Sequence, residues 1–278
     1  MRLAAIGLHP VKSTAIRSVA QAEVVGHGLV GDREWMIVDR DGELLSAREL
    51  HRTFTVVGRT RQTDPDLFGR GSVGGTVLIL DAPGMASRAV QLSGTTDSDA
   101  GTTKFGRPVA ARTVAPEVDA WLAEALGVPG VRLVWSPPRT REPIAFQDGT
   151  PLTLLTDASL ARLDEWLAET AQTRHEPQPA PLSYRRFRPN LYIEGAPTAF
   201  AEDGWSRVRI GTVELAGLGP VSRCVMTTLD EHTLARGKEP IRTLARHRRW
   251  DGQTWMSLGL RTITPGTLRL GDRVEVLD

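Results

Sequence analysis

Residues 35–45, WMIVDRDGELL, place two apolar runs on either side of a turn and decide the predicted fold. The run Trp35–Val38 is followed by Asp39–Gly42, a typical hairpin turn, and then by Glu43–Leu45. Further apolar runs bounded by turn residues predict strands at 3–8, 22–25 and 77–80. Short strands at this spacing are typical of a β-barrel or sandwich.

Three stretches with helical signals interrupt the β pattern. The first covers 116–126, with Pro116 in its first turn and Gly127 as its stop. The second covers 157–170 with Asp157 as N-cap, and the third covers 240–248. More strands are expected at 131–135, 190–194, 208–210, 212–216 and, broken by a turn, 268–276. The predicted fold class is therefore α+β, rich in β-barrel structure, with a few helices.

Composition limits the possible functions. The 278 residues are 40% apolar and 24% charged, as in a globular protein, and the net charge of +1 argues against nucleic acid as a partner. The single cysteine excludes a disulfide framework, a four-cysteine zinc site and an internal iron–sulfur cluster. No apolar segment approaches the roughly 18 residues that suggest a membrane span. We expect a cytoplasmic protein that does not bind membranes, with a domain seam at the loop Ser136–Arg139.

Cys224, in the stretch GPVSRCVMTT, is the first candidate for chemistry. A lone cysteine before an apolar pair is more often buried filler than a reactive group. The Gly-Pro pair upstream and the polar Ser222-Arg223 pair favour a loop, and an adjacent guanidinium favours the thiolate form. A thiolate is a nucleophile or a soft ligand for a transition metal.

Other residues are candidate anion ligands. Arg188 and Asn190 precede a predicted strand, and a guanidinium matches phosphate oxygens, although a solvated loop fits equally well. Thr156 and Ser159 open a helix whose free N–H groups attract anions, although simple capping explains them too. The N-terminal candidates, each ordinary by itself, are Lys12, Ser13 and Arg33.

Several motifs are absent from the sequence. It has no GxxxxGK[ST] phosphate-binding loop, no GxGxxG after a strand and no HExxH, which argues against common nucleotide, dinucleotide and zinc sites. Asp230 and His232 follow the cysteine but are better explained as surface loop residues. A solvated helix face, or less readily a partner-docking patch, explains the cluster Arg242, Arg246, Arg248 and Arg249.

Taken together, HPVKS (9–13), GDREW (31–35), FRPN (187–190) and SRC (222–224) with its downstream TT form an ordered set. This set resembles the MOSC-domain molybdenum-cofactor proteins with an N-terminal MOSC-associated β-barrel, in particular the amidoxime-reducing component and its bacterial relatives. The resemblance extends to the final PGTLRLGDRVEVL and thus over essentially the whole chain. It implies an N-terminal MOSC-associated β-barrel domain at 1–136 and a MOSC β-barrel domain at 137–278.

The resemblance also implies a molybdenum cofactor, Mo-molybdopterin, at the junction of the domains. Cys224 would ligate molybdenum and act as the catalytic residue, with Arg223 beside it. The positions that match the family's cofactor-holding residues are Lys12, Ser13, Arg33, Thr156, Ser159, Arg188, Asn190 and Ser222.

The implied activity is reductive removal of oxygen from a small N-oxygenated substrate, such as an amidoxime, a hydroxamate or an N-hydroxylated base. Some bacterial relatives carry a C-terminal iron–sulfur domain that this chain lacks, so we expect electrons from a separate redox protein. Two alternatives stay open. One is a sulfur transferase that uses a Cys224 persulfide, and the other is a non-catalytic carrier of the molybdenum cofactor.

Overall fold

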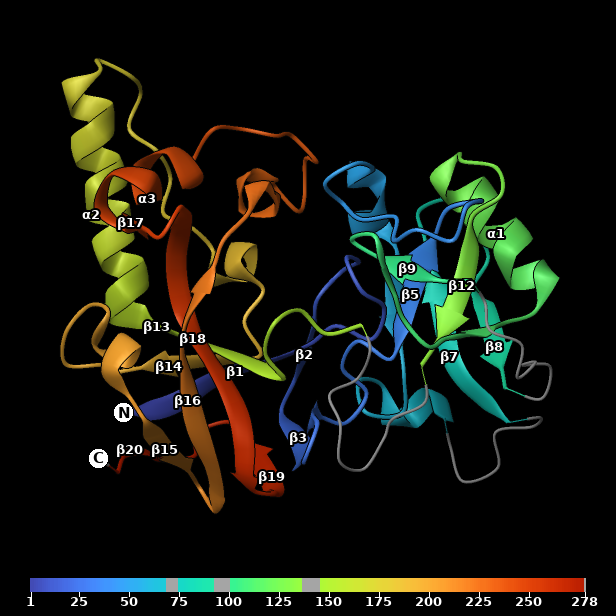
Figure 1. Cartoon of the computed structure of the whole chain (residues 1–278), viewed down its shortest axis with the longest axis horizontal. Coiled ribbons are helices and arrows are strands. Elements are labelled where there is room, and N and C mark those ends of the chain that lie inside the picture. The colour runs from blue at the N-terminus through green and yellow to red at the C-terminus, as the bar shows by residue number, and fades with distance from the viewer. Residues whose placement is uncertain (69–74, 93–100, 137–145, 278) are drawn as a thin grey trace. The chain divides into compact units, whose positions relative to one another are not determined.

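The computed structural model describes residues 1–68, 75–92, 101–136 and 146–277. The chain divides into two compact units, each built from separate stretches of sequence (Figure 1). Unit 1 comprises Met1–Gly7, Ala20–Gly28 and Gly149–Asp278, and unit 2 comprises Leu8–Val19 and Leu29–Asp148. Of the predicted seam Ser136–Arg139, the last three residues lie outside the described residues.

A seven-stranded path in the order β1-β14-β13-β18-β16-β15-β20 forms the main sheet of unit 1. β17 joins this sheet by pairing with β18, whereas β19 and β3 pair with each other in a separate sheet that includes β4 (Gly28–Leu29). The bounds are β1 (Arg2–Leu8), β3 (Gln21–Val25), β13 (Leu152–Thr156), β14 (Leu191–Glu194), β15 (Arg207–Ile210), β16 (Val213–Ser222), β17 (Arg249–Trp250), β18 (Gln253–Thr264), β19 (Gly266–Arg269) and β20 (Val274–Val276).

Unit 2 contains smaller sheets, β11-β12-β5, β6-β7-β8 and β10-β9. The bounds here are β2 (Arg17–Val19), β5 (Trp35–Val38), β6 (Val57–Arg59), β7 (Thr76–Asp81), β8 (Arg88–Gln91), β9 (Thr103–Lys104), β10 (Arg107–Pro108), β11 (Arg112–Thr113) and β12 (Arg132–Trp135). The short strand β4 (Gly28–Leu29) falls where the chain passes from unit 1 to unit 2. The prediction of a β-rich α+β protein is confirmed.

The predicted hairpin at 35–45 forms only in part. Strand β5 has the predicted bounds, and Asp39 N donates to Glu43 O at 2.9 Å to close the turn. Gly42 adopts a φ of +86°, and a Cβ there would lie 2.3 Å from the carbonyl oxygen of Gly101. The returning residues 43–45 make the isolated bridge Val38–Leu44 instead of a full strand. β12 takes their place beside β5.

The described residues contain three α-helices. α1 (Pro116–Leu126) has the predicted bounds, and Gly127 ends it in the left-handed conformation. α2 (Asp157–Thr173) runs three residues further than predicted, and its N-cap is Thr156 instead of Asp157, because the Thr156 side chain accepts from Ser159 N. α3 (Ile241–His247) is one residue shorter than predicted at each end. No described helix is both long enough and apolar enough to cross a membrane.

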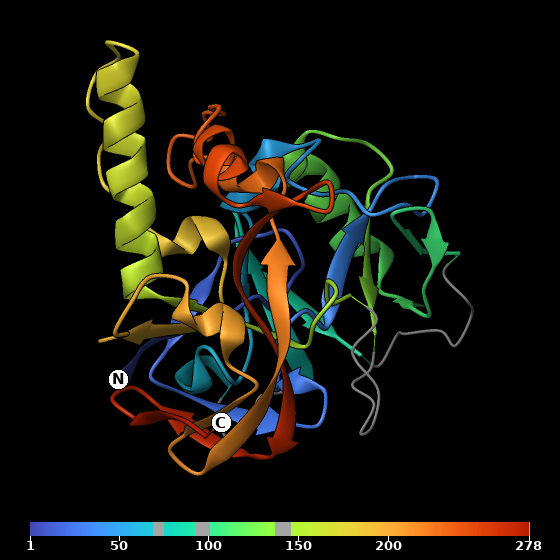
Figure 2. The same ribbon diagram turned by 60° about the vertical axis from the view of Figure 1, so that its left-hand side comes forward.

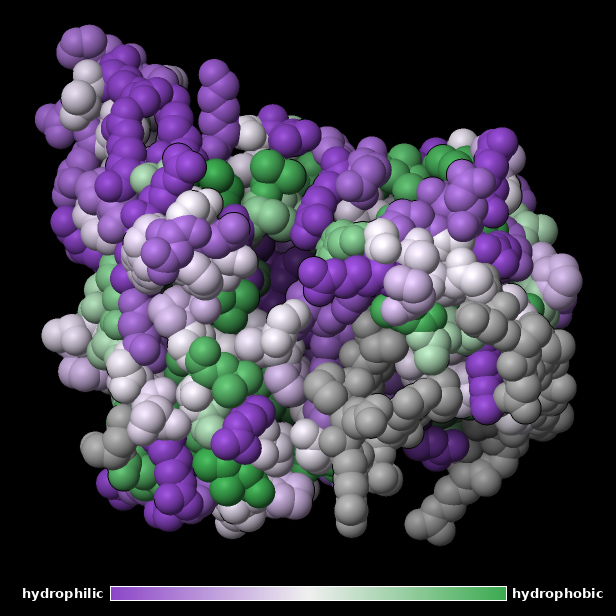
Figure 3. Space-filling model, viewed as in Figure 1, coloured by the Kyte–Doolittle hydropathy of each residue, from purple (hydrophilic) through white to green (hydrophobic). Residues whose placement is uncertain are grey.

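Each unit has its own apolar core. In unit 1, α2 and α3 pack on the sheet through Leu160, Leu163, Leu244 and Met256, and Phe187 of the FRPN segment joins the same cluster. In unit 2, α1 packs against β12 and β8 through residues that include Val118, Trp121 and Leu122. Figure 2 shows α2 running away from the sheet, and Figure 3 shows mainly hydrophilic side chains over that helix. Phe187 therefore packs the FRPN segment onto the apolar core of unit 1.

Candidate functional site

The thiol of Cys224 lies just beyond the end of a central strand of unit 1. Strand β16 runs to Ser222, so the predicted loop around the cysteine is shorter than expected and begins only at Arg223. Shifts in strand register on both sides of Pro220 accommodate glycine and proline residues within this strand. Cys224 is half-buried and caps the 3₁₀ helix η5 (Val225–Thr228). Thr227 N and Oγ1 both donate to Cys224 O, at 3.2 and 3.1 Å, and fix the backbone at the thiol.

Arg223 ties this loop to two other segments of unit 1. Its backbone N donates to Thr254 O at 2.7 Å, and its Nε donates to Met256 O at 2.8 Å. Its Nη1 donates to Phe187 O at 3.2 Å. A guanidinium offers several donors in a fixed plane, so one side chain can bridge β18 and the FRPN segment. Arg223, the residue next to Cys224, thus holds the loop in place, and we call it the brace of this loop.

The FRPN segment follows the 3₁₀ helix η3 (Tyr184–Phe187), and Arg188 caps that helix. Arg188 has a left-handed backbone, with a φ of 50°. Asn190 is buried, and its Nδ2 donates to Gly7 O at 3.1 Å while its Oδ1 accepts from Thr153 N at 3.2 Å. Asn190 directly precedes β14, and its side chain links β1 and β13, the two strands that flank β14.

The FRPN and SRC segments lie side by side, because two ion pairs join the residues around them. Arg186 Nη2 lies 2.8 Å from Asp230 Oδ2, and Arg185 Nε lies 2.8 Å from Glu231 Oε1. Arg186, Asp230 and Glu231 were not among the predicted site residues. The sequence carries no spacing signal for pairs separated by more than 40 residues. The predicted residues Arg188, Ser222, Arg223 and Cys224 thus come from neighbouring segments of one unit.

Thr156 and Ser159 occupy a buried cap at the start of α2. Their hydroxyls donate to Glu202 Oε2, at 3.1 and 2.8 Å, and Ser159 Oγ accepts from Phe200 N at 2.7 Å. Burial raises the pKa of the Glu202 carboxyl, although these hydroxyl donors oppose the shift. The capping alternative for this pair is confirmed by the structure. Glu202 itself was missed by the sequence analysis.

Lys12, Ser13 and Arg33 lie on two adjacent loops of unit 2. Arg33 N donates to His9 O at 2.8 Å, and Lys12 N donates to Trp35 O at 2.8 Å. These bonds bring the HPVKS and GDREW segments together, as their proposed common role requires. Lys12 Nζ lies 2.7 Å from Asp148 Oδ1, a residue that the sequence analysis did not select.

The charges around Lys12 are concentrated and partly buried. Burial is the largest effect on Lys12 and lowers its pKa to about 8, against the opposing influence of Asp148. Arg33 and Lys104 add positive charge and lower it further. Lys12, Arg33 and Lys104 hold the pKa of Asp148 below its ordinary value. Together with Asp32, which pairs with Arg33, these groups are three cations and two carboxylates, and the remaining positive charge makes the cluster suited to an additional anion.

The buried carboxylate of Asp32 contacts both of these loops. Asp32 is fully buried, and its Oδ1 accepts from His9 N at 2.7 Å and lies 3.0 Å from His9 Nδ1. Its Oδ2 pairs with Arg33. Burial would raise the pKa of Asp32, but Arg33 and His9 hold it well below the usual range. Asp32 therefore stays ionised and orients Arg33.

Three of the predicted site residues share an uncommon backbone conformation. Ser13, Arg33 and Arg188 have φ values of 64°, 55° and 50°. Non-glycine residues rarely adopt this left-handed region, and such strain of order 1–3 kcal/mol clusters where a side chain must be held for function. Six other described non-glycine residues also adopt it, so the conformation by itself does not mark these three positions as functional.

Within the part of the chain that the structure describes, Cys224 lacks partners for a metal site made of protein ligands alone. Among the described residues, no group of three or more His, Cys, Asp or Glu side chains could hold a metal ion. A transition metal bound to this soft thiolate would need its remaining ligands from a cofactor. Within unit 1, the thiol and the residues Arg188, Ser222 and Arg223 of the neighbouring segments form a donor set that fits a metal carried by an anionic organic ligand.

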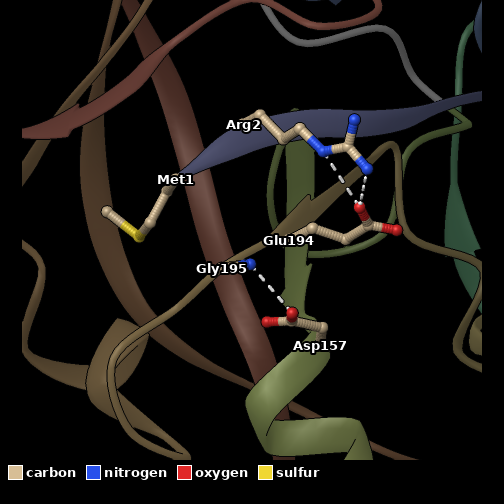
Figure 4. A pocket seen from close by; sticks show the side chains of 5 residues that line it. All are labelled: Met1, Arg2, Asp157, Glu194 and Gly195. Carbon is tan, nitrogen blue, oxygen red and sulfur yellow. Dashed lines mark hydrogen bonds and ion pairs between the residues drawn. The ribbon is translucent and has the colours of Figure 1, made fainter.

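A cavity of about 510 Å³ lies elsewhere in unit 1, lined by Met1, Arg2, Asp157, Glu194 and Gly195 (Figure 4). Arg2 pairs with Glu194 at 2.5 Å, and Asp157 Oδ2 accepts from Gly195 N at 2.8 Å. Both groups of the ion pair are substantially exposed. None of the predicted site residues lines this open cavity, so we do not assign it to the candidate site.

Comparison with known proteins gives family matches over most of the chain. The model of the MOSC N-terminal beta barrel domain matches residues 1–129, and that of the MOSC domain matches residues 141–275. The chain is 26% identical to mitochondrial amidoxime-reducing component 1 of Mus musculus, over 99% of this chain and 82% of that protein. It is 30% identical to the Danio rerio protein of that name, over 88% and 74%. It is 31% identical to molybdenum cofactor sulfurase 3 of Aedes aegypti, over 88% of this chain but only 32% of that protein.

Proposed function

The chain belongs to the MOSC family, with an N-terminal MOSC β-barrel domain and a MOSC domain, and from this premise we propose a molybdenum-cofactor-dependent reductase. Its substrates would be small N-oxygenated compounds such as amidoximes, hydroxamates and N-hydroxylated bases. The observation that carries the proposal is the half-buried Cys224 thiol, fixed by Arg223 beside the FRPN segment. The relatives named amidoxime-reducing component, which match over most of their length, support this choice of reaction.

We assign the cofactor contacts by the chemistry of each side chain. Cys224 would ligate molybdenum as a thiolate. Lys12, Arg33 and Arg188 would bind the anionic end of the pterin, because cations form strong charge-assisted hydrogen bonds with phosphate. Ser13, Asn190 and Ser222 would add neutral hydrogen bonds. Thr156 and Ser159 would act less directly, because their hydroxyls are engaged with Glu202.

When bound, the cofactor supplies a two-electron redox centre, and the protein supplies ligation, orientation and charge. Overall, two electrons and two protons convert the N–OH group to N–H and release water. Arg223 holds the Cys224 loop in one position through its carbonyl acceptors on β18 and η3. Lys12 carries its positive charge at neutral pH, because its lowered pKa of about 8 still lies above 7. A separate redox protein would deliver the electrons, and we propose a cytoplasmic location.

The test uses protein expressed with its cofactor and a chemical reductant. With reduced methyl viologen as donor, we expect the wild-type protein to convert benzamidoxime to benzamidine, and Cys224→Ala to give no product. Circular dichroism of both proteins checks that the variant folds. A molybdenum-loaded wild-type protein that forms no benzamidine would contradict the proposed reductase.

A sulfur transferase is the second candidate, because relatives named molybdenum cofactor sulfurase match 88% of this chain. In that function Cys224 would carry a persulfide instead of binding metal. Persulfide trapping with an alkylating reagent, together with molybdenum analysis of the same sample, separates the two functions. A cofactor carrier would contain molybdenum and turn over none of the substrates.

A further inference from the structure

The segment from Leu229 to Trp250 presents exposed charges of one sign. Its basic side chains that lie open to solvent are Arg236, Lys238, Arg246 and Arg249. Within the described residues, none of these four forms an ion pair. The carboxylates of the same segment, Asp230, Glu231 and Glu239, are half-buried, and each pairs with an arginine, at 2.8, 2.8 and 2.5 Å. The adjacent Asp251 is also exposed and contributes one negative charge, so the four cations leave a net positive charge for a partner, although the whole chain carries only +1.

Two of the arginines that the sequence analysis grouped with this segment do not contribute. Arg248 was expected on a solvated helix face, but it is buried and its Nη2 lies 2.6 Å from Asp203 Oδ2. Its guanidinium also lies 4.1 Å from the Phe200 ring centre. Arg242 pairs with Glu176 and Glu239. Since both side chains have internal partners, only Arg246 and Arg249 of that sequence cluster are exposed and, among the described residues, without an ion pair.

The segments that carry these four cations lie close to the helix that begins at Cys224. Gly237 N donates to Thr228 O at 3.1 Å, which places Arg236 and Lys238 beside the end of η5. Helix α3, which carries Arg246, packs against η5. Arg249 pairs with Thr254 across β17 and β18, and Thr254 O accepts from the backbone N of Arg223. Each cation is thus one or two contacts away from the thiol loop.

An apolar centre accompanies the charges. Val225, the residue after Cys224, is 38% exposed, and Trp250 is 40% exposed. The Trp250 ring stacks on Trp255 with centres 5.7 Å apart, and Trp255 lies opposite Ser222 in the sheet. Exposed aromatic side chains held by packing, within a polar rim, are typical of protein–protein interfaces.

We propose that this basic surface, made of Arg236, Lys238, Arg246 and Arg249 around Val225 and Trp250, docks an acidic electron-donor protein. The inference rests on the proposed reductase function, which requires electrons at the Cys224 site. A donor protein is favoured over a lipid surface because the patch has few cations and a rigid aromatic centre. Opposite charge would steer the donor to the surface and bring its redox group near the thiol loop.

Binding is measured by calorimetric titration of the cofactor-loaded protein with two acidic one-electron carriers, a plant-type ferredoxin and a flavodoxin. We expect binding of at least one carrier at low salt and at least a tenfold loss of affinity at 0.5 M salt, where the Debye length falls to about 4 Å. The double variant Arg246→Glu/Arg249→Glu should weaken binding at least tenfold. The matched control, Arg261→Glu/Arg269→Glu, changes two exposed arginines on β18 and β19, and β19 lies at the opposite end of unit 1 from α3 (Figure 1). It should bind as the wild type does.

Turnover with two kinds of donor separates this proposal from the reductase itself. The Arg246→Glu/Arg249→Glu variant should reduce benzamidoxime normally with reduced methyl viologen, but poorly with the carrier that binds. The docking surface is contradicted if neither carrier binds, if both double variants behave alike, or if anionic phospholipid vesicles bind more tightly than the carriers. Absence of benzamidine with methyl viologen contradicts the reductase instead.

Discussion

Lys12 Nζ lies 2.7 Å from Asp148 Oδ1, although 136 residues separate the two along the chain. The lysine side chain is almost fully buried, whereas that of Asp148 is largely exposed. A buried ammonium with one exposed partner destabilises the folded protein, because the ion pair does not fully offset the loss of hydration. Such a residue is retained when its charge serves a ligand.

Replacement of Lys12 by methionine should therefore stabilise the cofactor-free protein. We expect Lys12→Met to raise the free energy of unfolding at pH 7 by about 1 kcal/mol, since the buried charge is removed and Asp148 remains hydrated. Urea unfolding measures the change. The same substitution should lower the molybdenum content, which elemental analysis measures. A variant that is less stable and fully loaded with molybdenum would show that Lys12 is a structural residue.

The difference in unfolding free energy between the wild type and Lys12→Met should depend on pH. The pKa of Lys12 is about 8 in the folded protein and near 10.5 in the unfolded chain. Below pH 8 both states hold the proton, so the cost of the buried charge is present in full. From pH 8 to 10.5 the unfolded chain binds more protons than the folded protein, so stability rises with pH. Urea unfolding at pH 7, 9 and 10.5 should show the wild type approaching Lys12→Met, and a constant gap would contradict the assignment.

Arg223 should matter for cofactor retention through its hydrogen bonds and not only through its charge. Arg223→Lys keeps the positive charge but cannot reach both Met256 O and Phe187 O in the same geometry. We expect a loss of about 1–3 kcal/mol in unfolding free energy and a lower molybdenum content. Arg269→Lys, at an exposed site on β19, is the control and should change neither quantity. Equal molybdenum in all three proteins would argue against the brace.

Glu202 offers a test of the cap at the start of α2. Its raised pKa means that the folded protein holds a proton more strongly than the unfolded chain, so Glu202 makes stability fall as pH rises above 4.5. Glu202→Gln keeps an oxygen that accepts from Thr156 and Ser159 without a buried charge. It should remove this fall and leave stability at pH 7 equal or higher, whereas Glu202→Ala should lose about 1–3 kcal/mol. Thermal unfolding of the three proteins at pH 5 and pH 8 measures these differences in stability. If Glu202→Gln and the wild type show the same dependence on pH, Glu202 is not the cause of the fall.

Local signals in the sequence predicted the elements whose structure depends on local residues. The bounds of α1 follow from Pro116, one apolar face and Gly127, and those of β5 follow from four consecutive apolar residues. The strand Gln253–Thr264 was not predicted, because polar residues and Gly259 interrupt its apolar pattern. It exists because β13 and β16 pair with it on both sides. A Cβ at Gly259 would lie 2.4 Å from Thr150, a close approach that no local signal reveals.

The candidate site shows the same division. The resemblance selected Lys12, Thr156 and Ser159 as candidates, but not the carboxylates that contact them. Asp148 and Glu202 act through contacts between distant segments, and a single carboxylate in a loop carries no spacing signal. The extension of β16 to Ser222 was also missed, since glycine and proline usually end a strand. A Cβ at Gly217 would lie 1.9 Å from Trp205 O, so a glycine within this strand permits a close backbone approach.

The most direct test of the account is the molybdenum content of Cys224→Ala compared with that of the wild type, both expressed with the cofactor. Ligation through a single thiolate predicts about one molybdenum per wild-type chain and a near-complete loss in Cys224→Ala. Ser222→Ala, two residues earlier, should retain most of the metal, because Ser222 would contribute only a hydrogen bond. A folded Cys224→Ala protein with wild-type molybdenum content would contradict the central claim.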